Sequence, residues 1–384
     1  MNSEKFYKKR HTLDKLVKNL GIIAIAIPTL FLIFLISSLL ITASSAFTSY
    51  LIKVDLPTNY IKTEAEANQY LANYIKPAKN PLSFFSISAQ ENIVKYKLNG
   101  ETWLPASSHL SDVLSKNMNI DHLPLDSKKM IEDWQSNNLI KKEFNFSFFT
   151  GKESREPELA GILTSLVGSI YTILLCILIA LPVSICTAIF LEEFAPKNIL
   201  TTLIEININN LAAVPSIVFG LLGLSILINI VGLPRSAPIT AGITLAMMIL
   251  PILVITTRQA LRSVPINVKQ AALALGATKM QVILHHTLPL SLPGIATGVI
   301  LSVARAIGET APLILIGMVA FIVDIPHNIF DPATALPVQI YLWSSSPEHA
   351  FQAKTAAAIL FLLTLLIVIN MVAVYIRKKY ENRW

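Results

Sequence analysis

The sequence predicts an all-α membrane protein with six transmembrane helices and a mixed-type extracytoplasmic domain inserted after the first of them. Two observations support this fold class. The chain of 384 residues is 53% hydrophobic and only 14% charged, with a mean hydropathy of +0.58, whereas soluble domains carry roughly 25% charged residues. The charges are also uneven, because 35 of the 55 lie in residues 1–159. This composition excludes a disordered chain and an ordinary soluble enzyme.

Six apolar runs are long enough to cross a bilayer, which needs about 20 apolar residues. The first, 20–42, follows a basic cytoplasmic N-terminus, 1–19. A cleaved signal peptide is the alternative, but signal sequences have apolar regions of roughly 7–15 residues, so we expect a retained helix. The transmembrane domain, 159–384, holds the other runs, at 161–190, 208–231, 239–257, 293–322 and 355–376.

The basic residues predict the orientation of these helices. Four segments hold fifteen basic residues, whereas the short segments 232–238 and 323–354 hold only two. Lysine and arginine accumulate on the cytoplasmic side, so both termini are expected in the cytoplasm of a bacterial inner membrane. This bias explains the net charge of +7 as a signal of membrane topology, so membrane lipid is an expected partner and nucleic acid is not. The four basic segments are 1–19, 191–204, 258–292 and 377–384.

Residues 43–158, here called the insert domain, lie between the first two runs. They mix short apolar stretches with Pro, Asn and Ser and carry almost balanced charge. This pattern predicts a small folded extracytoplasmic domain. It contains no recognisable cluster of metal ligands and no serine accompanied by a base and an orienting acid. We therefore expect no metal and no catalytic residue, and favour a structural or docking role.

The segment 258–292, here called the docking loop, has a helix-turn-helix pattern. One helix is expected to end near Gly276, a residue suited to a left-handed closing position. A second is expected to begin at Thr278 with a capping box, to end at Pro289, and to give way to the next span at Pro293. Its exposed apolar residues need a covering partner. A DNA-binding motif is the alternative, but the adjoining span holds this unit against the bilayer.

The loop resembles the docking loop of permease subunits of bacterial ABC importers, with the usual pattern E-A-A-x3-G-x9-I-x-L-P. The resemblance implies that it docks into a groove on an ATPase subunit. Gln270 replaces the glutamate of the pattern and His286 replaces its isoleucine, which puts one polar docking contact in doubt. The matching residues are Ala271, Ala272, Gly276, Leu288 and Pro289.

The fifth run carries Arg305 about 18 Å from Pro293 along a helix, near the bilayer midplane. A charge at that depth costs at least roughly 2.5–3.5 kcal/mol, so it should face protein or water. Glu309, four residues later, is expected on the same helix face as Arg305. Gly308 is expected to keep that face open, and Pro312 is expected to bend the helix. One interpretation is a buried ion pair that only joins helices. The other is an anion pathway in which the guanidinium grips an oxyanion.

Residues 160–384 resemble the A-type permease subunit of phosphate-specific ABC importers, which have a type I-like permease fold. The resemblance implies a phosphate pathway at Arg305, Gly308, Glu309 and Thr310. The motifs that carry it are LEEFAPK at 191–197, NLAAVPSIVFGLLGL at 210–224, RAIGETAP at 305–312 and ALPVQIYLW at 335–343.

The resemblance also implies the partners: an ABC ATPase dimer, a second permease of the C-type, and an extracytoplasmic phosphate-binding protein. The chain has no G-x4-G-K-[ST] phosphate loop, so we expect it to be no enzyme and to bind no cofactor, with ATP and Mg on the ATPase. A permease for molybdate or sulfate, or a membrane-anchored extracytoplasmic enzyme or sensor, remains as an alternative. Arg258 and Arg262 could attract anions, although topology and lipid contacts explain them slightly better.

Overall fold

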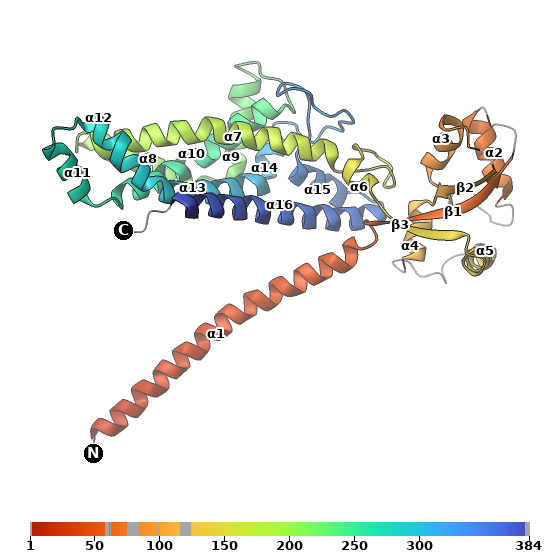
Figure 1. Cartoon of the computed structure of the whole chain (residues 1–384), viewed down its shortest axis with the longest axis horizontal. Helices are drawn as coiled ribbons and strands as arrows, with labels where there is room; N and C mark the ends of the chain where they lie inside the picture. Colours follow the sequence, from red (N-terminus) through yellow and green to blue (C-terminus); the bar gives the residue numbers. More distant parts are fainter. Residues whose placement is uncertain are drawn as a thin grey trace.

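The computed structural model describes residues 2–57, 61, 63–74, 84–98, 100–115 and 124–380. Figure 1 shows an elongated helical bundle, with the insert domain at one end and the docking loop at the other. The first helix, α1 (Asn2–Ala43), meets the bundle with its C-terminal end, beside the insert domain, and its N-terminal end lies away from the bundle. The two functional segments that the sequence places on opposite sides of the membrane are thus separated by the length of the bundle.

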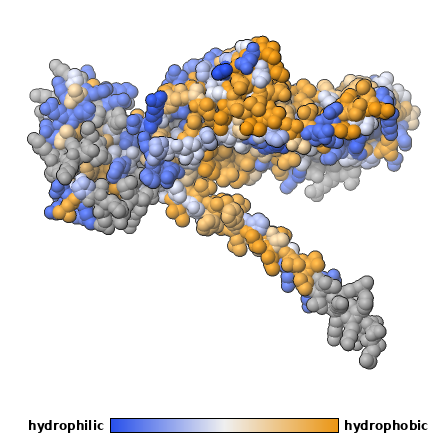
Figure 2. Space-filling model, turned by 180° about the vertical axis from the view of Figure 1, so that it is seen from behind, coloured by the Kyte–Doolittle hydropathy of each residue, from blue (hydrophilic) through white to orange (hydrophobic). Residues whose placement is uncertain are grey.

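The helix α1 is continuous, so the predicted basic segment and first span form one helix. Its apolar side chains are exposed through most of its length, as Ile25 and Ile41 show. Only its last turns contact the bundle, where Ala43 is fully buried beside α16 (Ala350–Tyr380). Figure 2 shows apolar side chains covering both α1 and the bundle, as expected for surfaces in contact with lipid.

The insert domain contains a three-stranded antiparallel sheet with helices around it, in agreement with the predicted mixed type. The central strand β1 (Thr48–Leu56) pairs with β2 (Gly100–Pro105) and β3 (Ile140–Phe144). Alternate residues of β1 are buried, because one face of the sheet covers the domain core. The helices are α2 (Glu64–Tyr74), α3 (Ile87–Lys95), α4 (Ser108–Leu114), α5 (Leu125–Ser136) and α6 (Ser147–Thr150).

Five helical segments in the described residues are long and apolar enough to cross a membrane, or six if one bent pair counts as a span. Besides α1 and α16, they include α7 (Leu163–Ile189), α10 (Pro238–Arg262) and α13 (Leu288–Gly308). The helix α7 continues into a π-helical turn, η3 (Phe190–Phe194), and η5 (Ile283–Thr287) precedes α13 in the same way.

The predicted third span, 208–231, is broken. Its place is taken by α8 (Ile199–Ala212) and by α9 (Ser216–Leu222) with η4 (Gly223–Ile228), which meet at an angle of 103°. Pro215 caps α9 and explains the break, because proline cannot continue the hydrogen bonding of α8 and restricts the residue before it.

The predicted fifth span, 293–322, is wrong at both ends. The helix α13 begins at Leu288 and ends at Gly308, and a short helix, α14 (Ala311–Leu315), follows after a break. Pro289 does not end the second loop helix, because it lies in the first turn of α13, where its missing N–H costs little. The segment from Lys279 to Gly308 is therefore one continuous helical stretch.

Candidate functional site

The Arg305–Glu309 pair lies where α13 ends. Arg305 is in the last turn of α13, and its Nε lies 3.5 Å from Glu309 Oε1. Glu309 is the C-cap of α13, four residues after Arg305: its φ of −79° is still close to helical, whereas its ψ of 123° leaves the helix. The ion pair therefore spans one helical turn, as the sequence predicts, and the helix ends at the pair.

Local sequence explains this ending. Pro312 stands in the first turn of α14, where it has no N–H to continue the helix from Gly308. Thr310 caps α14 without a side-chain hydrogen bond. No heavy atom lies within 4 Å of the position that a Cβ on Gly308 would occupy. The space beside the pair is therefore open, as the sequence predicts for Gly308.

The two broken segments pack against each other. A Cβ on Gly220 of α9 would lie 2.7 Å from the Cα of Pro312 of α14, so these helices touch at backbone distance. Irregular backbone at membrane depth is tolerated only where protein buries it or where it lines a water-filled cavity. The side chain of Arg305 is 39% exposed and that of Glu309 is 19% exposed, so the pair is not sealed inside the bundle.

The docking loop has the local structure that the sequence predicts at its turn. The helix α11 (Ile266–Ala274) is followed by Gly276 in the left-handed region, with φ +88°. The helix α12 (Lys279–Val282) then begins with both hydrogen bonds of a capping box between Thr278 and Gln281. This geometry fixes the angle between the two arms of the loop.

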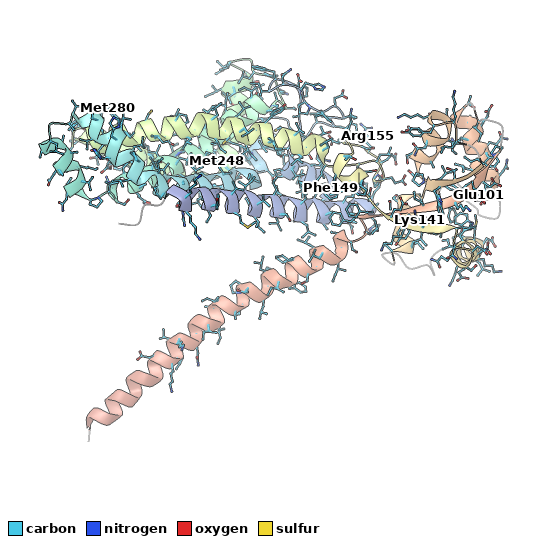
Figure 3. All side chains as sticks on the ribbon, in the orientation of Figure 1. Glu101, Lys141, Phe149, Arg155, Met248 and Met280 are labelled. Carbon is cyan, nitrogen blue, oxygen red and sulfur yellow. The ribbon has the colours of Figure 1, made fainter. Side chains whose placement is uncertain are left out.

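The predicted docking residues differ in exposure. Gln270, Ala271, Gly276 and Pro289 are exposed, Leu288 is half-buried, and Ala272 is buried. Ala272 therefore packs inside the loop and is not available to a partner. Leu275 and Met280, 89% and 53% exposed, present the apolar surface that needs covering. Met280 is labelled in Figure 3, at the end of the bundle farthest from the insert domain.

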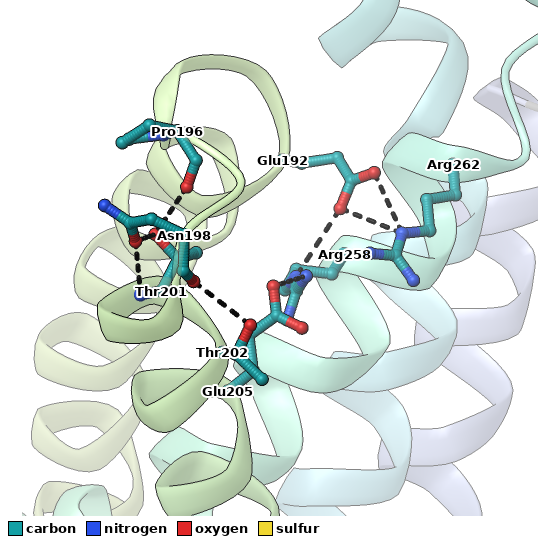
Figure 4. Close-up of polar contacts among 8 residues, drawn as sticks. All are labelled: Glu192, Pro196, Asn198, Thr201, Thr202, Glu205, Arg258 and Arg262. Atoms are coloured by element: carbon teal, nitrogen blue, oxygen red, sulfur yellow. Dashed lines mark hydrogen bonds and ion pairs between the residues drawn. The ribbon is translucent and has the colours of Figure 1, made fainter.

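Arg258 and Arg262 are engaged by acids, which sequence reasoning missed. Glu205 of α8 lies 2.7 Å from Arg258 Nη2, and Glu192 of η3 accepts from Arg262 Nε at 2.8 Å (Figure 4). Glu192 and Glu205 are visible in the sequence, but nothing in it places them against the last turns of α10. These arginines are therefore already neutralised and are poorly suited to attract anions.

A buried acid at the opposite end, Glu153, was also missed. It is only 6% exposed, and its Oε2 accepts hydrogen bonds from the Ile322 N–H at 2.9 Å and the Thr334 hydroxyl at 3.5 Å. Burial raises the pKa of the Glu153 carboxyl, and these hydrogen bonds oppose the rise. The nearby Arg155 lies over the Phe321 ring, 5.2 Å from its centroid. Residues 153–155 thus hold the loop between α14 and α15 (Leu336–Ser344).

The long apolar helices, the broken pair and the exposed loop together define a multi-pass membrane transport subunit. Comparison with known families agrees: the model of the family described as binding-protein-dependent transport system inner membrane component matches residues 180–382. This chain belongs to that family. A second family model, described as a domain of unknown function (DUF3333), matches residues 4–120.

Individual relatives match a little over half of the chain. The probable ABC transporter permease protein YqgI of Bacillus subtilis is 33% identical over 210 residues, covering 52% of this chain and 71% of the relative. The phosphate transport system permease protein PstA 1 of Mycobacterium tuberculosis is 33% identical over 218 residues, which cover 56% of this chain and 70% of the relative. The phosphate transport system permease protein PstA of Xylella fastidiosa is 33% identical over 225 residues, which cover 58% of this chain and 77% of the relative.

Proposed function

We propose that this chain is the permease subunit of an ATP-driven phosphate importer and contributes to the pathway for inorganic phosphate across a bacterial inner membrane. The observation that carries the proposal is the Arg305–Glu309 pair at the break between α13 and α14, in a chain whose relatives are named phosphate transport permeases. The pair is loose: its Nε–Oε1 distance of 3.5 Å exceeds the roughly 2.7–2.9 Å of a strong charge-assisted hydrogen bond.

This looseness suits a transient anion site. The guanidinium stays charged and offers parallel N–H donors to a tetrahedral oxyanion. Glu309 partly neutralises the guanidinium when the site is empty, so a bound anion is held weakly enough to leave. The open space beside Gly308 leaves room for the anion next to the pair. Thr310 follows in the same break and supplies a hydroxyl within the pathway segment.

The partners follow from the two ends of the bundle. We propose that an ABC ATPase dimer covers the apolar docking loop in the cytoplasm, where both termini also lie, and that this ATPase binds ATP and Mg while the present chain binds no cofactor. A C-type permease would complete the pathway, and an extracytoplasmic binding protein would deliver phosphate. The partly exposed Arg305 supports a second permease, because two such faces can enclose a pathway between them.

The test combines partners, substrate and site. The tagged chain is purified in mild detergent, and the complex is reconstituted with its binding protein for uptake of labelled phosphate. An ATPase and a second permease should co-purify, and excess sulfate or molybdate should leave phosphate uptake unchanged. Competition by either anion would favour another oxyanion. Isolation as a lone homodimer, without an ATPase, would contradict the proposal.

The site is tested by Arg305→Lys, which keeps the charge but removes the planar fork. We expect at least a tenfold loss of phosphate uptake with normal membrane levels, while Glu309→Gln slows turnover less severely. The exposed Arg235 provides the matched control, because Arg235→Lys makes the same exchange outside the pathway. If both pathway variants lose uptake only in proportion to lost complex, the pair is merely structural.

A further inference from the structure

The π-helical turn η3 contacts both arms of the docking loop. Glu193 Oε1 lies 2.5 Å from Lys269 Nζ of α11. The next residue, Phe194, makes a cation–π contact with Lys279 of α12, whose Nζ lies 6.0 Å from the centroid of the Phe194 ring. A single turn at the end of α7 therefore holds the loop on either side of the Gly276 turn.

The Glu193–Lys269 pair is shielded from water. Glu193 exposes 18% of its side chain and Lys269 exposes 16%. Exposed surface pairs contribute little, because water screens the charges and the side chains lose freedom. A shielded pair behaves differently, since removal of one partner leaves the other charge poorly solvated. This pair is therefore suited to hold α11 in one position.

The other face of η3 is fixed to the bundle. Glu192, the neighbour of Glu193, accepts from Arg262 Nε at 2.8 Å and lies 3.5 Å from Arg258 Nε (Figure 4). Glu205 ties Arg258 to α8 in turn. Consecutive residues of a helical turn point in different directions, so Glu192 can face α10 while Glu193 faces α11. The turn η3 thus continues α7 and joins the loop to α10 through opposite charges, and Arg258 extends this network to α8.

We propose that η3 is a brace that couples the docking loop to the transmembrane bundle, and that Glu193 and Lys269 are positioning residues for energy coupling. This inference rests on the proposed function, in which an ATPase docks on the loop. Movement of the docked loop is carried to α7 and α10 through the brace. A loop that is released from η3 can still bind the ATPase, but ATP hydrolysis then no longer drives the bundle.

The experiment measures phosphate imported per ATP hydrolysed by the reconstituted complex. Glu193→Lys and Lys269→Glu should each lower this ratio at least fivefold while the ATPase still co-purifies. The double reversal restores opposite charges and should return the ratio to within twofold of the parent. Lys378, exposed near the end of α16, provides the matched control: Lys378→Glu should leave the ratio unchanged.

An unchanged ratio in either single variant overturns the brace, as does failure of the double reversal to restore a lost ratio. If the reversed chains assemble poorly, Glu193→Gln, Lys269→Gln and their combination replace them. If the two residues act as a pair, the double variant should lower the phosphate-to-ATP ratio no more than the more severe single variant does. Losses of this ratio that add up in the double variant would overturn the pair.

If the parent complex imports no phosphate, the proposed function is contradicted. The brace is then tested independently, by the rate of protease cleavage within residues 266–282. Each reversal should then raise the cleavage rate at least fivefold, and the double reversal should restore it.

Discussion

The insert domain and the helix α7 of the transmembrane bundle bury different kinds of side chain. The core of the insert domain holds large residues such as Ile52, Leu71 and Trp134. The residues of α7 that are buried in the bundle are all small: Thr164, Ser165, Gly168, Ser169, Thr172, Cys176, Ala180, Ser184 and Ala188. Several large apolar residues of this helix, such as Leu174 and Leu178, are exposed.

The difference follows from the two solvents. In water, burial of large apolar side chains is the main driving force for folding. In a bilayer the lipid tails are as apolar as leucine, so helices associate through close backbone approach at small residues. The insert domain is therefore stabilised by large buried side chains, whereas α7 packs against the bundle through small ones.

The largest expected effect comes from emptying the core of the insert domain. Trp134 is 4% exposed and packs edge-on against Phe84, with ring centroids 5.8 Å apart. Trp134→Ala should destabilise the domain by about 3–5 kcal/mol. Hydrogen exchange of the β1 amides measures this loss. Trp103→Ala is the control: Trp103 is 38% exposed, so its replacement should reduce the stability of the domain far less. Equal losses in the two variants would contradict the packing described here.

A smaller effect is expected from filling the bundle. A Cβ on Gly168 would collide with the carbonyl oxygen of Thr334, a backbone atom that cannot rotate away. Gly168→Val should therefore cost about 1–3 kcal/mol by overpacking. Thermal unfolding of the detergent-purified chain measures it. Gly21→Val makes the same change on α1, where no atom lies within 4 Å, and should be neutral. Indistinguishable midpoints would show that small residues are not required on α7.

The smallest effect concerns the joint between the two regions, where Glu153 is buried. Because its pKa is raised, the folded protein holds the proton more tightly than the unfolded chain. Its favourable contribution is therefore present at low pH and is lost as pH rises through the raised pKa. Glu153→Gln should flatten this pH dependence of the unfolding midpoint, whereas Glu156→Gln, at an exposed position, should not. An unaltered pH profile in Glu153→Gln would contradict this assignment.

Continuous apolar runs and turn chemistry were predictable from the sequence. The helices α7, α10 and α16 fall where their apolar runs predict, because each run is by itself about as long as a membrane-spanning helix must be. The Gly276 turn and the Thr278 capping box form as predicted, since both depend on residues within four positions of each other.

The breaks in the third and fifth runs were not predictable from hydropathy. The residues 213–215 and 309–310 lie inside apolar stretches, and α9 and α14 are stable as short helices because Gly220 and Pro312 let them pack together. That contact joins residues far apart in the sequence. Mean hydropathy over a local window of sequence therefore carries no information about this contact.

The sequence by itself predicted which segments are long and apolar enough to cross a membrane, an orientation from their basic flanks, and where Arg305 and the docking loop lie along the chain. Only the tertiary structure decided that α13 ends at Glu309, and that Glu192, Glu193 and Glu205 pair with the basic residues of α10 and α11. The physical reason is range. Hydropathy and capping act within a few residues, whereas ion pairs depend on distances that helix packing alone sets.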